Sequence, residues 1–295
     1  MAPGDGQPRM PLAYMPTTCS GIGCACIDSA SPAVRRLVDH IVGAVDAAQR
    51  CDAPFQHLVL DKIFPDDLYG EMMAAMPAER NFQPLAGRHR SSNRRADGSA
   101  TRIKVDLLPE LVRRFHPEHR TLWTVVGGAL RARSVRDAFV RRLGPGLRRR
   151  FGASYAATNF FAVPMLTRDT AGYQIHPHTD TRWKAITVHI YLPRDSALDG
   201  VGTVFSELLP DGTLRRVKQV AFIPNHGYAF AVGDDTWHSV DPLDDLPMPR
   251  DSILHTYFVD QGLLLKTRNR ARRLGNFVAN EARWLVRGTS LAARL

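Results

Sequence analysis

The chain has 295 residues, enough to bury a substantial core, and one domain with appendages is favoured over two domains. Its 44% hydrophobic and 23% charged residues are typical of a soluble globular protein, and no run of about 18 apolar residues predicts a membrane span. The start of the chain lacks a secretory signal pattern, so a cytoplasmic location is the default expectation. The formal net charge of +10 suggests an acidic partner or substrate, or only solubility.

The first 30 residues predict a flexible leader, because they are rich in Pro, Gly, Ser, Thr and Cys without a usable period. Cys19, Cys24 and Cys26 lack the paired spacing of structural zinc sites, so free thiols are favoured over a metal site there. The folded domain is expected over 31–262, with helical support over 31–150 and a strand-rich core over 152–262.

Helices and one strand are expected in the N-terminal half. Ser31 and Pro32 open an amphipathic helix, 54–60 reads as a short strand, and Pro65 precedes a second helix. Residues 85–104 are rich in arginine and predict a solvated loop, or a lid that contacts substrate. Residues 107–150 read as helical and are expected to end at 144–146, where the sequence is Gly-Pro-Gly.

After Gly152 the residue pattern changes to short strand-like runs that are bounded by turn residues. Asp211-Gly212 between two of them is a hairpin signal, and so many short strands favour a barrel or sandwich. Residues 165–171 are expected to form a long turn. The strand-like runs are 159–163, 172–177, 184–192, 202–208, 218–224, 228–232 and 252–259.

The segment 263–295 again has apolar residues at helical spacing, and it is strongly basic. It predicts a C-terminal helical extension. Packing of this helix on the core, with its charged side in water, is favoured over a dedicated surface for nucleic acid, an anionic membrane or an acidic protein.

The chemistry concentrates around His178, Asp180 and His238. On a regular strand, Gln174, His176, His178 and Asp180 would point to the same side. His238 follows a strand and a turn, which is the context that a ligand from a facing strand needs. Two imidazoles and one carboxylate are the set that holds Fe(II) on one face and leaves the opposite positions open. An isolated H-x-D pattern is weak evidence, but its context strengthens it.

Arg250 and Ser252 supply that context at the start of the last strand. An arginine fork beside a hydroxyl suits the distal carboxylate of a dicarboxylic acid, because it can bind both oxygens at once.

The order H-x-D, His, R-x-S in a β-rich half resembles the 2-oxoglutarate/Fe(II)-dependent dioxygenase superfamily over roughly 155–261. The segment 185–193 and the turn and strand at 200–205 look like its prolyl-hydroxylase-like branch. The resemblance implies an α+β fold with a mainly β core, a double-stranded β-helix or jelly roll, flanked by N-terminal helices and a C-terminal helix. It implies His178, Asp180 and His238 as iron ligands, and Arg250, Ser252 and Tyr191 as the site for the C5 carboxylate of 2-oxoglutarate.

The cofactors expected from this resemblance are Fe(II), 2-oxoglutarate and O2, and the expected activity is hydroxylation of a C–H bond with release of succinate and CO2. The substrate would be an amino acid, a peptidyl residue or a natural-product intermediate, which an acidic carrier protein could present to the basic surface. A nucleic-acid demethylase and a non-catalytic, cupin-like metal-binding module are the alternatives.

Several residues near the expected iron ligands have two possible roles. Asn159 could bind the 1-carboxylate of 2-oxoglutarate or only make packing and turn contacts. His176 and Gln174 could line a substrate pocket or satisfy polar neighbours within the barrel. Thr187 and His189 share the face of Tyr191 and could touch 2-oxoglutarate.

Overall fold

The structure, a computed structural model, describes residues 31–85, 94–259, Gly275 and Val278. The expected leader, the segment 86–93 of the expected lid and nearly all of the basic C-terminal extension, with its predicted helix, lie outside the described residues. In the described part, no helix combines the length and the apolar character that crossing a membrane requires.

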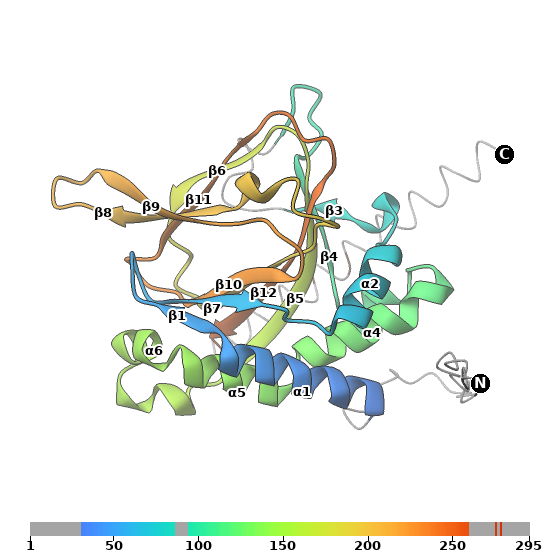
Figure 1. The fold of residues 1–295 in the computed structure, drawn as a ribbon, viewed down its shortest axis with the longest axis horizontal. Coiled ribbons are helices and arrows are strands. Elements are labelled where there is room, and N and C mark those ends of the chain that lie inside the picture. Colours follow the sequence, from blue (N-terminus) through green and yellow to red (C-terminus); the bar gives the residue numbers. More distant parts are fainter. Residues whose placement is uncertain (1–30, 86–93, 260–274, 276–277, 279–295) are drawn as a thin grey trace, which may run out of the picture.

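Two antiparallel sheets face each other, and helices cover the outer side of the larger one (Figure 1). The larger sheet has the order β1-β2-β10-β7-β12-β5-β4-β3, and the smaller one has the order β6-β11-β8-β9. From β5 to β12 the chain passes repeatedly between the sheets, and each sheet receives four of these eight strands. This arrangement is a double-stranded β-helix, so the predicted fold class is confirmed. The strands are β5 Phe160–Asp169, β6 Tyr173–His178, β7 Lys184–Tyr191, β8 Thr203–Leu208, β9 Leu214–Val220, β10 His226–Ala231, β11 Trp237–Leu243 and β12 Arg250–Val259.

Four strands from the N-terminal half extend the larger sheet at both edges. They are β1 Gln49–Cys51, β2 His57–Asp61, β3 Gln83–Pro84 and β4 Arg102–Asp106. Strand β4 pairs with β5 along its whole length, so the expected loop over 85–104 is wrong at its C-terminal end. The charged residues of this stretch favoured a loop over a strand. In the structure Lys104 and Asp106 form a buried ion pair of 2.6 Å, so neither side chain has to face solvent.

The helices lie where the apolar spacing places them, with one exception. Helix α1 begins at Pro32 after Ser31, as predicted, and buries Val34, Leu37, Ile41 and Val45. The helical region does not end at 144–146, because α6 begins there with Pro145 in its first turn. The helices are α1 Pro32–Ala47, α2 Asp66–Ala74, α3 Pro109–Val112, α4 Pro117–Leu130, α5 Arg133–Arg142 and α6 Gly144–Phe151, with short 3-10 segments η1 Glu79–Asn81, η2 Ala153–Ala157 and η3 Asp199–Val201.

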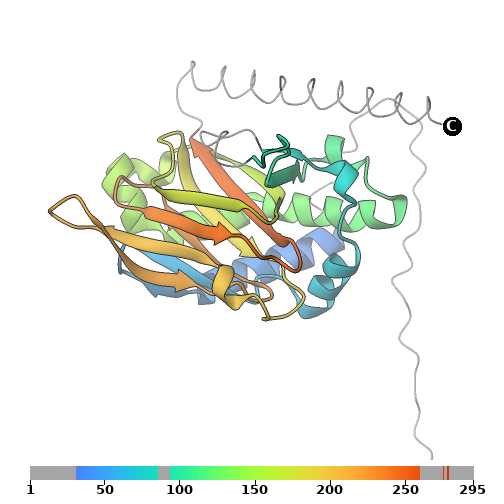
Figure 2. The same cartoon turned by 90° about the horizontal axis from the view of Figure 1, so that it is seen from above.

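Two connections between strands turn at a glycine with positive φ. The expected long turn over 165–171 is wrong, because β5 continues to Asp169 and a tight turn at Gly172 (φ 82°) leads into β6. The predicted hairpin between β8 and β9 is confirmed, with Gly212 at φ 83° in its turn. A glycine adopts this left-handed conformation without the steric cost of a Cβ. The hairpin projects beyond the body of the two sheets (Figures 1 and 2).

Candidate metal centre and adjoining cavity

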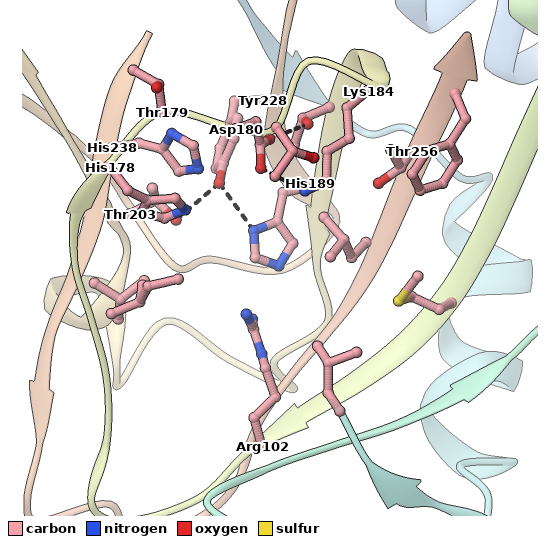
Figure 3. A pocket seen from close by; sticks show the side chains of 18 of the residues that line it. Arg102, His178, Thr179, Asp180, Lys184, His189, Thr203, Tyr228, His238 and Thr256 are labelled. Atoms are coloured by element: carbon pink, nitrogen blue, oxygen red, sulfur yellow. Dashed lines mark hydrogen bonds and ion pairs between the residues drawn. The ribbon is translucent and has the colours of Figure 1, made fainter. Parts of the chain in front are cut away.

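His178, Asp180 and His238 come together on the smaller sheet. His178 is the last residue of β6, Asp180 follows two residues later, and His238 lies on β11 directly opposite His178. The two imidazole rings have centroids 4.3 Å apart, and one possible ligand atom from each of the three residues lies within 4.8 Å of the others. The three residues that the sequence singles out therefore form one cluster (Figure 3).

Backbone carbonyls fix the tautomers of both histidines. Nδ1 of His178 lies 2.9 Å from the carbonyl oxygen of His176, and Nδ1 of His238 lies 3.0 Å from that of Thr236. A carbonyl oxygen can only accept, so each Nδ1 carries a proton and each Nε2 carries the lone pair. This is the arrangement in which a second hydrogen bond orients a metal-ligating histidine.

Both imidazoles are neutral near neutral pH, which a metal ligand must be. Burial lowers the pKa of His178 to about 4, and the neighbouring His238 ring contributes in the same direction. Burial likewise lowers the pKa of His238, although the Asp180 carboxylate opposes this shift. The two rings can therefore approach each other without carrying like charges.

Asp180 is held as a carboxylate by two side chains of β7. Lys184 Nζ donates to Oδ1 at 2.5 Å, and the Thr187 hydroxyl donates to Oδ2 at 2.5 Å. Burial alone would raise the pKa of this carboxyl, but the Lys184 ammonium and the hydrogen bonds from Lys184 and Thr187 hold it well below its usual range. Two oriented imidazoles and one ionised carboxylate fit a divalent iron ion, and Thr187 orients the carboxylate.

The cluster lines a cavity of about 460 Å³ between the two sheets. This volume is in the range of small-molecule sites, which are mostly apolar with a few placed polar groups. The apolar and aromatic lining consists of Leu85, Met165, Tyr173, Ile175, Trp183, Val240, Leu254 and Phe258. Apart from the cluster, the polar lining includes Arg102, Lys184, Thr187, His189, Thr203, Tyr228 and Thr256.

Strand β6 is irregular, so its side chains do not alternate between the two faces as the sequence predicted. Ile175 pairs with Val240 and His178 pairs with His238, so three steps on β6 correspond to two on β11. This bulge changes which side chains face inward. Tyr173 and Ile175 line the cavity together with His178, whereas Gln174 and the exposed His176 do not. The expectation that Gln174 and His176 share the face of His178 is therefore wrong.

Arg250, Ser252 and Tyr191 belong to a buried hydrogen-bond network behind the lining. The Tyr191 hydroxyl lies 2.9 Å from Thr203 Oγ1, and Ser252 Oγ lies 2.7 Å from His189 Nε2. His189 Nδ1 in turn lies 3.0 Å from the Tyr228 hydroxyl. His189, Thr203 and Tyr228 line the cavity, and Arg250, Ser252 and Tyr191 stand one contact further back.

Asn159 lies away from this cavity. It is exposed and borders a different depression, which it shares with Arg131, Arg133 and Arg136. The structure therefore does not bring Asn159 together with the metal cluster. Asn159 does not line this cavity, so its position does not support the role expected for it at the 1-carboxylate of 2-oxoglutarate.

The cavity also contains residues that the sequence did not single out. Arg102 reaches it from β4, and Lys184, Thr203 and Tyr228 reach it from β7, β8 and β10. Alternation on β7 places Lys184 on the face opposite Thr187 and His189, but a register shift beside Lys184 lets all three line the cavity. No sequence signal placed Arg102 there, because it belongs to a run of arginines that reads as a solvated loop.

No protein-family model matches the chain, and no curated protein matches its sequence. Solved structures similar to it include a Pseudomonas putida prolyl-4-hydroxylase, with 16% identity, 75% of this chain and 99% of that chain covered, and a TM-score of 0.43. A Trichoplax adhaerens prolyl hydroxylase, solved with a hypoxia inducible factor peptide fragment, has 11% identity, coverages of 77% and 91%, and a TM-score of 0.47. A Burkholderia pseudomallei oxidoreductase of the 2OG-Fe(II) oxygenase family has 12% identity, coverages of 75% and 89%, and a TM-score of 0.39. These are distant likenesses.

Proposed function

We propose that the protein is an Fe(II)- and 2-oxoglutarate-dependent dioxygenase that hydroxylates a C–H bond. The observation that carries this proposal is the content of one cavity. A cluster of two neutral imidazoles and one ionised carboxylate shares it with Arg102, a cation suited to a dicarboxylic acid. A binding module that only holds a metal has no need for this second feature.

In this proposal His178, Asp180 and His238 hold Fe(II), and Thr187 fixes the carboxylate of Asp180 for that task. Bound Fe(II) and 2-oxoglutarate supply the oxidising chemistry, in which O2 is consumed and succinate and CO2 are released. The hydrogen-bonded side chains of His189, Thr203 and Tyr228 form a preorganised polar wall. The apolar wall, which includes Trp183, leaves room for the carbon skeleton of a substrate and limits the access of water.

The substrate class that we propose is an amino acid, a peptidyl residue or a natural-product intermediate. The mostly apolar cavity suits a molecule with a hydrocarbon part. Presentation by an acidic carrier protein would use the positive charge of the chain, which is formally +10.

The test is anaerobic reconstitution with Fe(II) and 2-oxoglutarate. We expect a weak visible charge-transfer band, followed by succinate once air is admitted. His178→Ala is expected to abolish both signals, because it removes one of three ligands. His176→Ala is the matched control, since His176 lies on the same strand, is exposed and does not line the cavity.

Wild-type protein that gives neither the band nor succinate would refute the proposed function. Equal signals from wild type and His178→Ala would refute the assigned ligand set. Metal binding without a band or succinate would instead favour the metal-binding module.

A further inference from the structure

Two arginines flank one aspartate across three neighbouring strands of the larger sheet. Arg102 on β4 is the cross-strand partner of Asp169 on β5, and Asp169 is the partner of Arg250 on β12. Arg102 binds the two carboxylate oxygens of Asp169 at 2.6 and 3.2 Å, and Arg250 Nη1 binds Oδ2 at 2.7 Å. Asp169 is fully buried, so this row carries two positive charges and one negative charge inside the protein.

The two arginines differ in what their remaining donors do. Arg250 is fully buried, and its Nε and Nη2 already contact the Val201 carbonyl at 2.8 Å and Thr203 Oγ1 at 3.4 Å. Arg102 uses Nε and Nη2 for Asp169, and in the described part of the chain its Nη1 makes no hydrogen bond. Arg102 also lines the cavity, and Arg250 does not.

Arg102 enters the cavity from the side opposite the metal cluster, with its guanidinium directed toward His189 (Figure 3). Asp169 fixes the plane of this guanidinium, and the Tyr173 ring lies 4.5 Å from its central carbon. The attraction of Asp169 raises the pKa of Arg102, so its charge is permanent, although burial opposes this shift. Lys184, the other cation in the described lining, is already bound to Asp180.

The polar groups beside Arg102 are neutral and already paired with one another. Burial, with Arg250 and Arg102 nearby, lowers the pKa of His189 well below its ordinary value, so its ring is neutral. The Tyr228 hydroxyl donates to Thr203 Oγ1 at 3.1 Å. Among the described lining residues at this end of the cavity, Arg102 therefore carries the positive charge that an anion could bind.

We propose that Arg102, rather than Arg250, makes the direct contact with the distal carboxylate of 2-oxoglutarate, and that Arg250 is a positioning residue that acts through Asp169 and Thr203. This inference rests on the proposed function. It assigns the carboxylate end of the cavity to β4, a strand outside the eight-stranded jelly roll.

The test compares 2-oxoglutarate with 2-oxopentanoate, which has the same chain length and 2-oxoacid group but no distal carboxylate. Binding of both to the Fe(II)-loaded protein is measured by anaerobic equilibrium titration without substrate or O2. We expect wild type to prefer 2-oxoglutarate, and Arg102→Gln to reduce this preference by about 10- to 100-fold, the usual effect of losing a hydrogen bond between ionised groups. Binding of 2-oxopentanoate should be unchanged, which also reports that the variant is folded.

Arg168→Gln is the matched control. Arg168 makes a similar bidentate ion pair, with Asp251 at 2.8 and 2.9 Å, and its side chain is 16% exposed compared with 12% for Arg102. It does not line the cavity, so we expect the wild-type preference in this variant.

Wild type that binds neither 2-oxoacid would refute the proposed function and this inference with it. A full preference for 2-oxoglutarate in Arg102→Gln would refute this inference alone. If Arg102→Gln does not fold, Arg102→Lys retains a charge beside Asp169 without the planar fork. We expect a reduced preference in Arg102→Lys, and an unchanged preference there would also overturn the assignment.

Discussion

Replacement of Thr187 by valine tests how the cavity prepares Asp180 for a metal. The Thr187 hydroxyl donates to Asp180 Oδ2 at 2.5 Å, and valine keeps nearly the same shape without a donor. A hydrogen bond to a charged group contributes about 1.5–3 kcal/mol, and loss of such a partner typically weakens metal binding by about 10- to 100-fold. The two magnitudes agree, because a tenfold change corresponds to about 1.4 kcal/mol. We therefore expect the Kd for Fe(II) to rise by about 10- to 100-fold.

The assay is an anaerobic titration of metal-free protein with Fe(II) at neutral pH. Thr256→Val is the matched control, because Thr256 is the cross-strand partner of Thr187 and lines the same cavity. In the described part of the chain its hydroxyl has no hydrogen-bond partner, so its loss should leave the Kd unchanged. A Thr187→Val protein with wild-type affinity, or an equal loss in Thr256→Val, would refute the orienting role of Thr187.

Two predictions concern stability. His255 is fully buried, and neither of its ring nitrogens has a hydrogen-bond partner among the described residues. Burial lowers the pKa of His255 from 6.5 to about 3. The unfolded chain therefore binds a proton that the folded protein does not, and this residue lowers stability as the pH falls below 6.5, by about 2 kcal/mol between pH 7 and pH 5. Denaturant unfolding of His255→Leu should show a smaller loss over this range, and an equal loss would contradict the reasoning. A Cβ at Gly202 would lie 1.6 Å from the Val220 carbonyl oxygen, whereas nothing lies within 4 Å of one at Gly200. Gly202→Ala should thus lower the Tm and Gly200→Ala should change it much less; similar Tm values for the two variants would show that β8 and β9 can separate there without cost.

The metal cluster could be predicted from the sequence because its chemistry is local. His178 and Asp180 lie two residues apart, and His238 follows a recognisable strand and turn. The jelly roll could be predicted for a related reason, since its strands are short, apolar and separated by turn residues. These features depend on neighbours in the chain, and the structure confirms the fold and brings the three residues together.

The facing of β6 could not be predicted, because a bulge depends on the partner strand. The alternation rule places Gln174 and His176 beside His178, and the unequal spacing between β6 and β11 reverses this. Arg102 was missed for a similar reason. Its partner Asp169 lies 67 residues further along the chain, and neither residue carries a local signal for an ion pair.

The jelly roll begins at Phe160, but the residues that line its cavity begin earlier in the chain, with Leu85 and with Arg102 on β4. A fragment that starts at β5 would retain His178, Asp180 and His238, yet it would lose β4 and leave the backbone of β5 unpaired along one edge. The metal end and the arginine end of the cavity are thus encoded by separate segments. If Arg102 binds the distal carboxylate as proposed, substitutions in β4 would alter which acid the cavity accepts while His178, Asp180 and His238 stay in place.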